Sequence, residues 1–419
     1  MRGHSVSVIV VSRDRPAALV RCLKALTQQT HEPFEIIVVA DKQGRQAITT
    51  RPEVYRRIKV VKFDEPNISV ARNLGIAQAA GEIVAFIDDD AVAEPLWLDH
   101  LTQPFTDERV DASTGYVIGR NGISFQHRLG DVGPEGDSRE VPFEGTEAQI
   151  VNPSKMRAIK TQGTNMAFRR ELLLKLRGFD PEFRFYLDEA DLDIRLAREG
   201  GTVAIAPLAQ VHHGFEESAR RRRDRVPRTL FDVGASLAVF LARHSYPQNA
   251  WRAGLKEREA RRRSLIEHMV AGRIEPGEVK SLLRTFDEGW SDGQNRELEP
   301  LKPISPAESP FLRYRPDVPR QEHAVVAGRI WQQAASRDKA QQLADSGHAV
   351  TLILLSPTTV YHRVRFELDG YWIQRGGLYG RSIRAGSFMK LTRFQARIRR
   401  EIGRLVPVRG VTATKIDKR

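Results

Sequence analysis

The first half of the chain is predicted to form an α/β fold, in which helices cover a doubly wound and mostly parallel sheet. Short runs of valine, isoleucine and phenylalanine alternate there with segments of helical periodicity, which indicates strand–helix–strand units. One run, residues 83–87, is apolar throughout, as expected of a strand buried on both faces, and it ends in Asp88, Asp89 and Asp90. The second half differs in charge: residues 1–210 have a net charge of −3, whereas the remainder carries +16.

The secondary structure elements can be placed in order. Pro16 suits the first turn of a helix that presents an apolar stripe to the sheet, and alanines allow a second helix, residues 69–80, to pack closely. Right-handed crossovers are expected between parallel strands. The expected strands are residues 6–11, 34–40, 58–63, 83–87 and 202–206, and the expected helices are residues 16–26, 69–80, 171–176 and 188–200.

Composition indicates a cytosolic protein. Cys22 is the single cysteine, which excludes intrachain disulfides and fits a reducing compartment. The first strand begins at about Ser5 and leaves no room for a signal peptide. No apolar run approaches the roughly 18 residues that a membrane span needs.

Three carboxylates at the end of a buried strand need a compensating cation, because two like charges about 4 Å apart repel by roughly 4 kcal/mol at an effective dielectric of 20. Successive side chains on a strand face opposite sides, so Asp88 and Asp90 are expected on one side and Asp89 on the other. This edge of an open α/β sheet is where ligands bind, and hard oxygen ligands suit Mg²⁺ or Mn²⁺. The alternative is a solvated acidic turn ahead of a helix at residues 91–98.

Glycine-rich phosphate loops are missing from the sequence. Neither GxxxxGK[ST] nor GxGxxG follows the first strand, so the P-loop and dinucleotide fingerprints are absent. A nucleotide site in this chain would therefore be built on a metal ion rather than on glycine backbone.

Five motifs occur in the order that is typical of one family. They are VSVIVV from Val6, LxALxQQT ending at Thr30, EIIVVxD ending at Asp41, ARNxGIAxAxGE from Ala71 and FIDDD from Phe86. With these motifs, the chain resembles the family 2 glycosyltransferases of the GT-A fold over about residues 5–215. The resemblance implies a Mn²⁺ or Mg²⁺ cofactor, a nucleoside-diphosphate sugar donor, a glycan or lipid-linked acceptor and transfer with inversion.

The resemblance implies donor-binding roles around the first acidic cluster. Asp41 corresponds to a carboxylate that bonds the nucleotide base, and an ionised carboxylate suits a base N–H; the alternative is an aspartate that starts a turn. Arg72 would lie near the diphosphate, with a surface helix arginine as the alternative. Asp88 and Asp90 would hold the metal, and Asp89 would contact the ribose or the metal.

Further positions of the resemblance follow later in the chain. Gly163 would let the backbone approach the donor sugar. Asp188, Glu189 and Asp191 start a helix, where acids are also favoured simply by the helix dipole. Inverting transfer needs a carboxylate that takes a proton from the acceptor hydroxyl; the resemblance places this base at Glu189, with Asp188 as the alternative and Asp191 orienting the acceptor or the loop. His212 and His213 face opposite ways on an extended segment, so at most one of them is expected to reach the metal. The resemblance favours His212 as this further ligand, the alternative being a packed histidine.

The chain is expected to divide into four parts: a GT-A-like transferase domain (1–215), a basic helical extension (216–298), a proline-rich linker (299–320) and a small α/β C-terminal module (321–419). The extension contains the arginine run 220–225, which could contact an anionic membrane surface or form a solvated face of helices packed on the domain. Nucleic acid is not expected, because this run lacks interleaved aromatic residues.

Together these features predict a metal-dependent inverting glycosyltransferase of cell-surface polysaccharide or glycolipid synthesis. The expected location is the cytoplasm. If the basic extension contacts an anionic membrane surface, the protein is expected at the inner face of the cytoplasmic membrane. A nucleotidyltransferase on a related sheet would carry a glycine-rich basic loop after the first strand, and residues 12–16 are no such loop. A non-catalytic sugar-nucleotide-binding scaffold would have lost one acidic cluster, whereas both are present.

Overall fold

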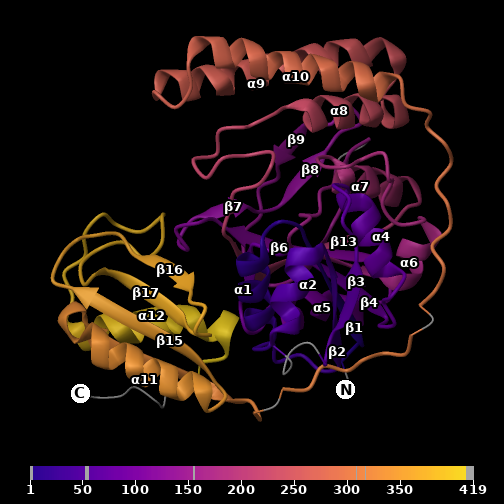
Figure 1. The fold of residues 1–419 in the computed structure, drawn as a ribbon. Helices are drawn as coiled ribbons and strands as arrows, with labels where there is room; N and C mark the ends of the chain where they lie inside the picture. Colours follow the sequence, from indigo (N-terminus) through magenta and orange to yellow (C-terminus); the bar gives the residue numbers. More distant parts are fainter. Residues whose placement is uncertain (1–2, 52–55, 154–155, 308, 317, 412–419) are drawn as a thin grey trace.

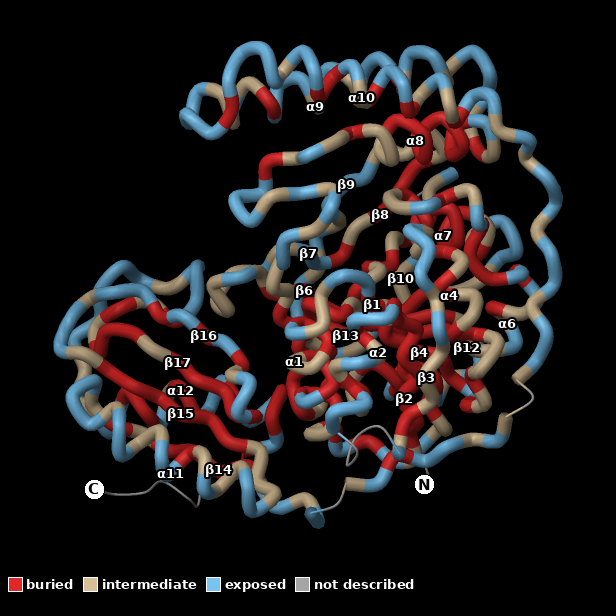
Figure 2. The backbone as a smooth tube through the Cα atoms, in the orientation of Figure 1, coloured by how far each residue is buried: buried red, intermediate tan, exposed pale blue. Residues whose placement is uncertain are grey.

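The chain forms a large N-terminal domain (residues 3–215), a layer of helices above it and a C-terminal module (residues 321–411) beside it (Figure 1). The buried backbone is concentrated in the central sheet of the domain and in the smaller sheet of the module (Figure 2). The structure, a computed structural model, describes residues 3–51, 56–153, 156–307, 309–316 and 318–411.

The main sheet decides the fold class. Within the described residues it has ten strands, in the continuous order β10-β13-β6-β12-β4-β1-β2-β3, with β5 beside β13 and β7 beside β6. The strands β3, β2, β1 and β4 are parallel, as are β6 and β13, whereas β12 lies antiparallel between β4 and β6. The predicted GT-A-like α/β class with parallel central strands is confirmed. The bounds are β1 Val6–Ser12, β2 Phe34–Ala40, β3 Lys59–Lys62, β4 Ile83–Asp88, β5 Ala91–Ala93, β6 Ala112–Ile118, β7 Phe125–His127, β10 Gln149–Val151, β12 Met166–Arg169 and β13 Val203–His213.

Side-chain alternation along β1 separates two apolar cores, one on each face of the sheet. Val8 and Val10 are buried with Leu19 of α1 on one face, whereas Ile9 is buried with Leu192 of α7 on the other. Helices therefore cover both faces, as in a doubly wound fold. The helices of the domain are α1 Pro16–Leu26, α2 Lys42–Thr49, α4 Ile68–Ile76, α5 Trp97–Thr102, α6 Arg170–Lys175 and α7 Asp188–Arg198, with a 3-10 turn at Gln103–Thr106.

Two segments beside the end of β4 differ from the sequence prediction. The alternative helix at residues 91–98 is instead the short strand β5, and only α5 after it is helical. β13 does not end at Ala206 but continues, after an irregularity between Ala206 and Gln210, to His213. Such irregularities re-aim a strand. Here the continuation pairs with β5 and brings the end of β13 alongside the acidic cluster.

The helical extension forms a layer over the N-terminal domain (Figure 1). Its helices are α8 Phe231–His244, α9 Pro247–Val270 and α10 Pro276–Gln294. α8 is mostly buried and crosses α10 so closely that a Cβ on Gly289 would lie 1.9 Å from the carbonyl oxygen of Phe231. α9 is largely exposed and strongly charged. In the part of the chain that the structure describes, no helix has the length and apolar character needed to cross a membrane.

An extended strap, residues 299–320, connects the helical layer to the C-terminal module along the edge of the domain. It is held by backbone N–H groups: that of Leu312 donates to Glu35 (2.8 Å) and that of Tyr314 donates to the carbonyl of Phe34 (2.8 Å). The backbone of this segment is therefore bonded to β2 of the domain at these two positions.

The C-terminal module is a four-stranded sheet, β14-β15-β17-β16, between two helices. Ala340 of α11 is buried against one face of the sheet, and Ile398 of α12 is buried against the other. A separate small sheet, β11-β8-β9, lies in the N-terminal domain. The bounds are β8 Gly130–Val132, β9 Ser138–Glu140, β11 Ala158–Ile159, β14 Gln321–Arg329, α11 Gln333–Asp345, β15 His348–Ser356, β16 Arg363–Phe366, β17 Trp372–Gly377 and α12 Phe394–Arg409.

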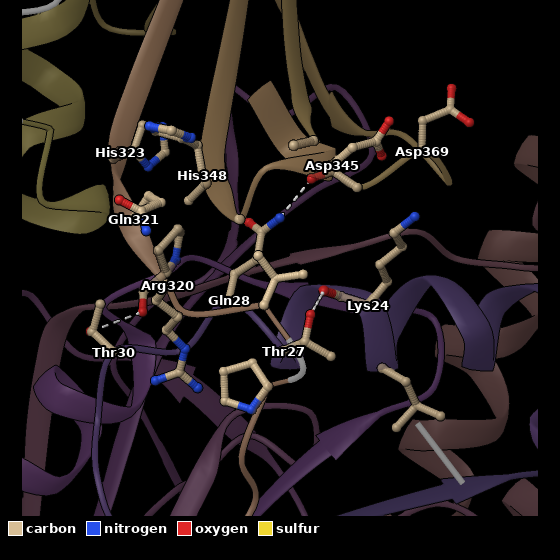
Figure 3. Close-up of a pocket in the computed structure, with 18 of the residues that line it drawn as sticks. Lys24, Thr27, Gln28, Thr30, Arg320, Gln321, His323, Asp345, His348 and Asp369 are labelled. Carbon is tan, nitrogen blue, oxygen red and sulfur yellow. Dashed lines mark hydrogen bonds between the residues drawn. The ribbon is translucent and has the colours of Figure 1, made fainter. Parts of the chain in front are cut away.

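The module meets the N-terminal domain around a cavity of about 690 Å³ (Figure 3). Lys24 and Gln28 line it from the N-terminal domain, Arg320 from the strap and His323 from β14. Gln28 Nε2 donates a hydrogen bond of 2.6 Å to the carbonyl of Gly370. The module is therefore docked on the end of α1 and on the strap.

Candidate metal and donor site

Asp88, Asp90 and His213 converge at the carboxyl end of β4. Each offers one ligand atom, and these atoms all lie within 4.8 Å of one another. Asp88 is the last residue of β4, Asp90 follows in the turn, and His213 ends β13, with its Nε2 3.3 Å from Asp90 Oδ1. The cluster has the size and the ligand types that a single divalent cation requires.

Asp89 faces away from this cluster, as strand alternation predicted. Its side chain is fully buried, accepts a hydrogen bond from Ser12 Oγ (2.7 Å) and forms an ion pair with Arg15, whose Nη2 lies 2.5 Å from Asp89 Oδ1. Burial raises the pKa of Asp89 to about 8, against the opposing charge of Arg15. The structure therefore does not bring Asp89 into the cluster of Asp88, Asp90 and His213, and its contact with the ribose stays a prediction.

Sequence reasoning missed Arg15, which compensates much of the acidic charge. It lies immediately before α1, and its Nη1 is also 3.0 Å from Asp90 Oδ2. The signal was present: Arg15 follows β1, which is the parallel neighbour of β4, and the carboxyl ends of neighbouring parallel strands meet at one edge.

The prediction that His212 completes the metal site is wrong. His212 Nε2 lies 2.8 Å from Glu94 Oε1, and its ring packs 4.8 Å from that of Trp372. Successive residues of a strand face opposite ways, so His213 is the residue that reaches Asp90. The sequence allowed one of the two histidines to reach the cluster, and the register of β13 selects the second.

Arg72 connects the first acidic cluster to the second. Its guanidinium forms an ion pair with Asp188, lies 3.6 Å from Asp88 and donates to the carbonyl of Gly163 (3.2 Å). It also lies over the ring of Phe179 at 5.1 Å, and it is 4% exposed, which excludes the surface-arginine alternative. The contact of Arg72 with the diphosphate stays a prediction.

Asp188 and Glu189 form a coupled pair at the start of α7. Burial raises the pKa of Asp188 to about 8, although Arg72 opposes this shift. Burial acts in the same sense on Glu189, but the charges of Lys160 and Arg72 and a hydrogen bond from Asp188 outweigh it and lower the pKa of Glu189. Of the two, Glu189 is therefore the group held as a carboxylate, which is the state a general base requires.

Two other predicted residues have structural partners. Asp191 lies 2.6 Å from Arg195 and 2.8 Å from His244, so it ties α7 to α8, and its role in orienting an acceptor stays a prediction. Asp41 caps α2 by accepting from the backbone N–H of Gly44 at 2.8 Å. Asp41 is therefore the turn-starting residue that the alternative describes, and its contact with the base stays a prediction.

A cavity of about 660 Å³ opens beside the acidic cluster and is lined by Asp88, Asp90 and His213. The same cavity is also lined by many basic residues, among them part of the arginine run 220–225 that the sequence analysis expected on a membrane surface or in solvent. Burial and the neighbouring charges of Arg225 and Arg261 lower the pKa of Arg221, which marks an excess of positive charge. The basic residues of the lining are Arg13, Arg15, Arg184, Arg220, Arg221, Arg225, Arg261, His268 and Arg273.

Comparison with known proteins gives several similarities. The chain is 30% identical over 247 residues to the O-antigen biosynthesis protein RfbC of Myxococcus xanthus, which covers 53% of this chain and 18% of that relative. It is 25% identical over 224 residues to the glucosyl-dolichyl phosphate glucuronosyltransferase of Haloferax volcanii, covering 51% and 69% of the two chains. The chain thus spans about a fifth of the first relative and about two thirds of the second.

Two solved structures show partial similarity to the structure. One is GalNAc-T7 with UDP, GalNAc and Mn²⁺, with a TM-score of 0.42, 17% identity and coverage of 57% of this chain and 48% of the other. The second is the mannosyltransferase PcManGT of Pyrobaculum calidifontis, with a TM-score of 0.41, 15% identity and coverage of 70% and 87%. Residues 7–177 match the model of the family described as glycosyl transferase family 2. The resemblance to family 2 glycosyltransferases that the sequence motifs predicted is therefore confirmed over residues 7–177.

Proposed function

We propose that the chain transfers a sugar from a nucleoside-diphosphate donor to a hydroxyl acceptor, with inversion and with the help of a divalent metal ion. The observation that supports this proposal is a cavity lined both by Asp88, Asp90 and His213 and by several arginines. The carboxylates of the cluster favour a bound cation, and the arginines favour a bound anion. A metal ion bound to a diphosphate supplies both charges at once.

The acidic cluster fits Mn²⁺ or Mg²⁺. Two carboxylates and one imidazole would hold the ion and leave positions for phosphate oxygens, since such ions are usually bound by a few protein ligands together with a substrate phosphate. When bound, the ion would stabilise the nucleoside diphosphate as a leaving group. Arg221 and Arg225, which line the same cavity, would hold the phosphate oxygens.

Glu189 would act as the general base. Its lowered pKa keeps it ionised, and Arg72 joins its neighbour Asp188 to Asp88 at the edge of the donor cavity. In this role Glu189 would remove the proton of the acceptor hydroxyl as the hydroxyl attacks the anomeric carbon on the face opposite to the diphosphate. Gly163, whose carbonyl fixes Arg72, would lie close to the sugar.

The acceptor is proposed to be a glycan or a lipid-linked sugar, in cell-surface polysaccharide or glycolipid synthesis. The printed names of two relatives, an O-antigen biosynthesis protein and a glucuronosyltransferase that acts on glucosyl-dolichyl phosphate, support this class. The enzyme would work in the cytoplasm, at the inner face of the cytoplasmic membrane.

Membrane contact would be made by the exposed face of α9. Trp251 (61% exposed) lies there beside Arg252 and Lys256, a combination typical of interfacial helices. We expect the full chain to co-sediment with vesicles that contain phosphatidylserine, to be released at high salt, and to ignore vesicles of phosphatidylcholine alone. Replacing Arg252 and Lys256 with glutamate should abolish this binding; unchanged binding by that variant would contradict the assignment to α9.

A metal-dependent thermal shift tests the donor site. We expect a nucleoside diphosphate and Mn²⁺ together to raise the melting temperature, since a ligand at about 100 times its Kd stabilises the folded state by about 2.7 kcal/mol. Excess chelator should remove most of the shift, because the diphosphate would lose the cation that pairs it with Asp88 and Asp90. A panel of nucleotide sugars would then identify the base and the sugar. A shift that persists in chelator would contradict the metal-dependent site.

A further inference from the structure

The C-terminal module inserts one arginine into the N-terminal domain directly behind the metal site. Arg409, in the last turn of α12, forms a two-pronged ion pair with Glu94: Nε lies 2.6 Å from Oε2 and Nη2 lies 2.8 Å from Oε1. The Arg409 side chain is 1% exposed and that of Glu94 is 3% exposed. Burial would raise the pKa of Glu94, but Arg409 and His212 lower it to about 2, so the pair is ionised.

Glu94 shares its carboxylate with His212, the residue before the proposed metal ligand. His212 Nε2 lies 2.8 Å from Glu94 Oε1, and its Nδ1 has no hydrogen-bond partner among the described residues. Trp372 of the module packs against the His212 ring at 4.8 Å, and the Arg409 guanidinium lies 4.1 Å from the Trp372 ring centre. The imidazole of His212 is therefore held between the carboxylate of Glu94 and the indole of Trp372. Arg409 contacts both of these groups, and both Arg409 and Trp372 belong to the module.

Because His212 and His213 are neighbours in β13, the contacts that hold the His212 side chain also restrain the direction of the His213 side chain. The two histidines are consecutive residues of one strand, so fixing the direction of one side chain fixes the opposite direction of the next. In the antiparallel pair, His212 is opposite Val92 and His213 is opposite Ala91, and the N–H of Gly214 donates to the carbonyl of Asp90 (2.7 Å). A rotation of the strand end about its axis would move His213 away from Asp90.

We propose that Arg409 is a positioning residue of the metal site, which acts through Glu94 and His212 to aim His213 at the ion. This inference rests on the metal site of the proposed function and assigns a task to the C-terminal module. Outer groups of this kind typically change metal affinity by about 10- to 100-fold when they are removed.

If Arg409 had a purely structural role, its replacement would destabilise the module without changing the metal site. A second buried arginine of α12 serves as the matched control. Arg397 is also buried in α12, 2% exposed, and its Nε lies 2.9 Å from Glu401 Oε1 within the module. Arg397→Gln should therefore destabilise the module without affecting the metal site. Arg409→Gln should destabilise the module and change the metal site as well.

The experiment uses the full chain with Mn²⁺ alone and no donor. The Kd is measured from the electron paramagnetic resonance signal of free Mn²⁺, and nitrogen coordination is measured from the ¹⁴N modulation of the electron spin echo of bound Mn²⁺. The wild type should show ¹⁴N modulation and His213→Ala should lose it. Arg409→Gln should weaken the modulation and raise the Kd about 10- to 100-fold, whereas Arg397→Gln should leave both unchanged.

Two further variants keep the test decisive if Arg409→Gln folds poorly. Arg409→Lys keeps the charge but loses the two-pronged geometry, so its Kd should lie between those of the wild type and Arg409→Gln. Trp372→Leu removes the ring from His212 without leaving an unpaired charge, and it should weaken the ¹⁴N modulation.

The outcomes separate this inference from the proposed function. If the wild type binds Mn²⁺ with ¹⁴N modulation while Arg409→Gln, Arg409→Lys and Trp372→Leu keep the same Kd and modulation, the positioning role is refuted and the metal site stands. If the wild type does not bind Mn²⁺, the metal site itself is refuted and the inference with it.

Discussion

Replacing Asp90 with asparagine is expected to lower metal-dependent sugar transfer by about a thousandfold. Asp90 is one of the two carboxylates of the cluster, and its carboxylate also contacts Arg15 and His213. Loss of one charged ligand should remove about 4 kcal/mol of transition-state stabilisation, and each 1.4 kcal/mol corresponds to about tenfold in rate. The release of nucleoside diphosphate in the presence of acceptor, at saturating Mn²⁺, measures the effect.

The matched control for Asp90 is Asp107→Asn. Asp107 is also an aspartate paired with an arginine, Arg109, but its side chain is 36% exposed, against 3% for Asp90, and it does not line the cavity beside Asp88 and Asp90. This variant should retain wild-type turnover. The role of Asp90 as a metal ligand would be disproved by an Asp90→Asn enzyme with wild-type turnover and Mn²⁺ affinity, or by a wild-type enzyme that remains fully active in chelator.

Glu189→Gln should lower turnover by about 10²- to 10⁴-fold while leaving the donor KM nearly unchanged. Glutamine keeps the size of the side chain but cannot accept the proton of the acceptor hydroxyl. The lowered pKa of Glu189 also fixes the pH dependence: the carboxylate remains ionised as the pH falls from 7 towards its ordinary value of 4.5, so this group should not reduce turnover in that range.

Two variants on the same helix test the assignment of the base. Asp191→Asn breaks the contacts to Arg195 and His244, so it should lower the melting temperature and leave turnover per folded enzyme nearly unchanged. Asp188→Asn leaves Arg72 without its main partner, so it should weaken donor binding. If Asp188→Asn loses turnover with an unchanged donor KM while Glu189→Gln stays active, Asp188 is the base.

Much of the N-terminal fold could be predicted because its signals are local. The β4 segment is apolar throughout and ends in three aspartates, so both its burial and the acidic edge follow from the order of the residues. Helical stripes such as that of α1 likewise follow from residue spacing. The family motifs lie in these same strands and helices, within the matched residues 7–177.

The partners of the site residues could not be predicted, because they depend on contacts between distant segments. Arg72 and Asp188 are 116 positions apart, and Asp90 and Glu216 are 126 apart. The choice between His212 and His213 depends on the register of β13 after its irregularity between Ala206 and Gln210. Pro207 indicates a break in the strand at this place, but it does not fix the register that follows. Tertiary pairing, rather than propensity, decides such cases.

The sequence by itself determined that a buried strand delivers Asp88 and Asp90 to one side of a sheet edge, because alternation along a strand is a local property. Only the tertiary structure decided which groups meet that edge: His213 rather than His212, arginines of the helical extension, and Arg409 of the C-terminal module behind Glu94. The physical reason is that ion pairs and metal ligands are selected by distances in space, and the packing of remote elements sets those distances.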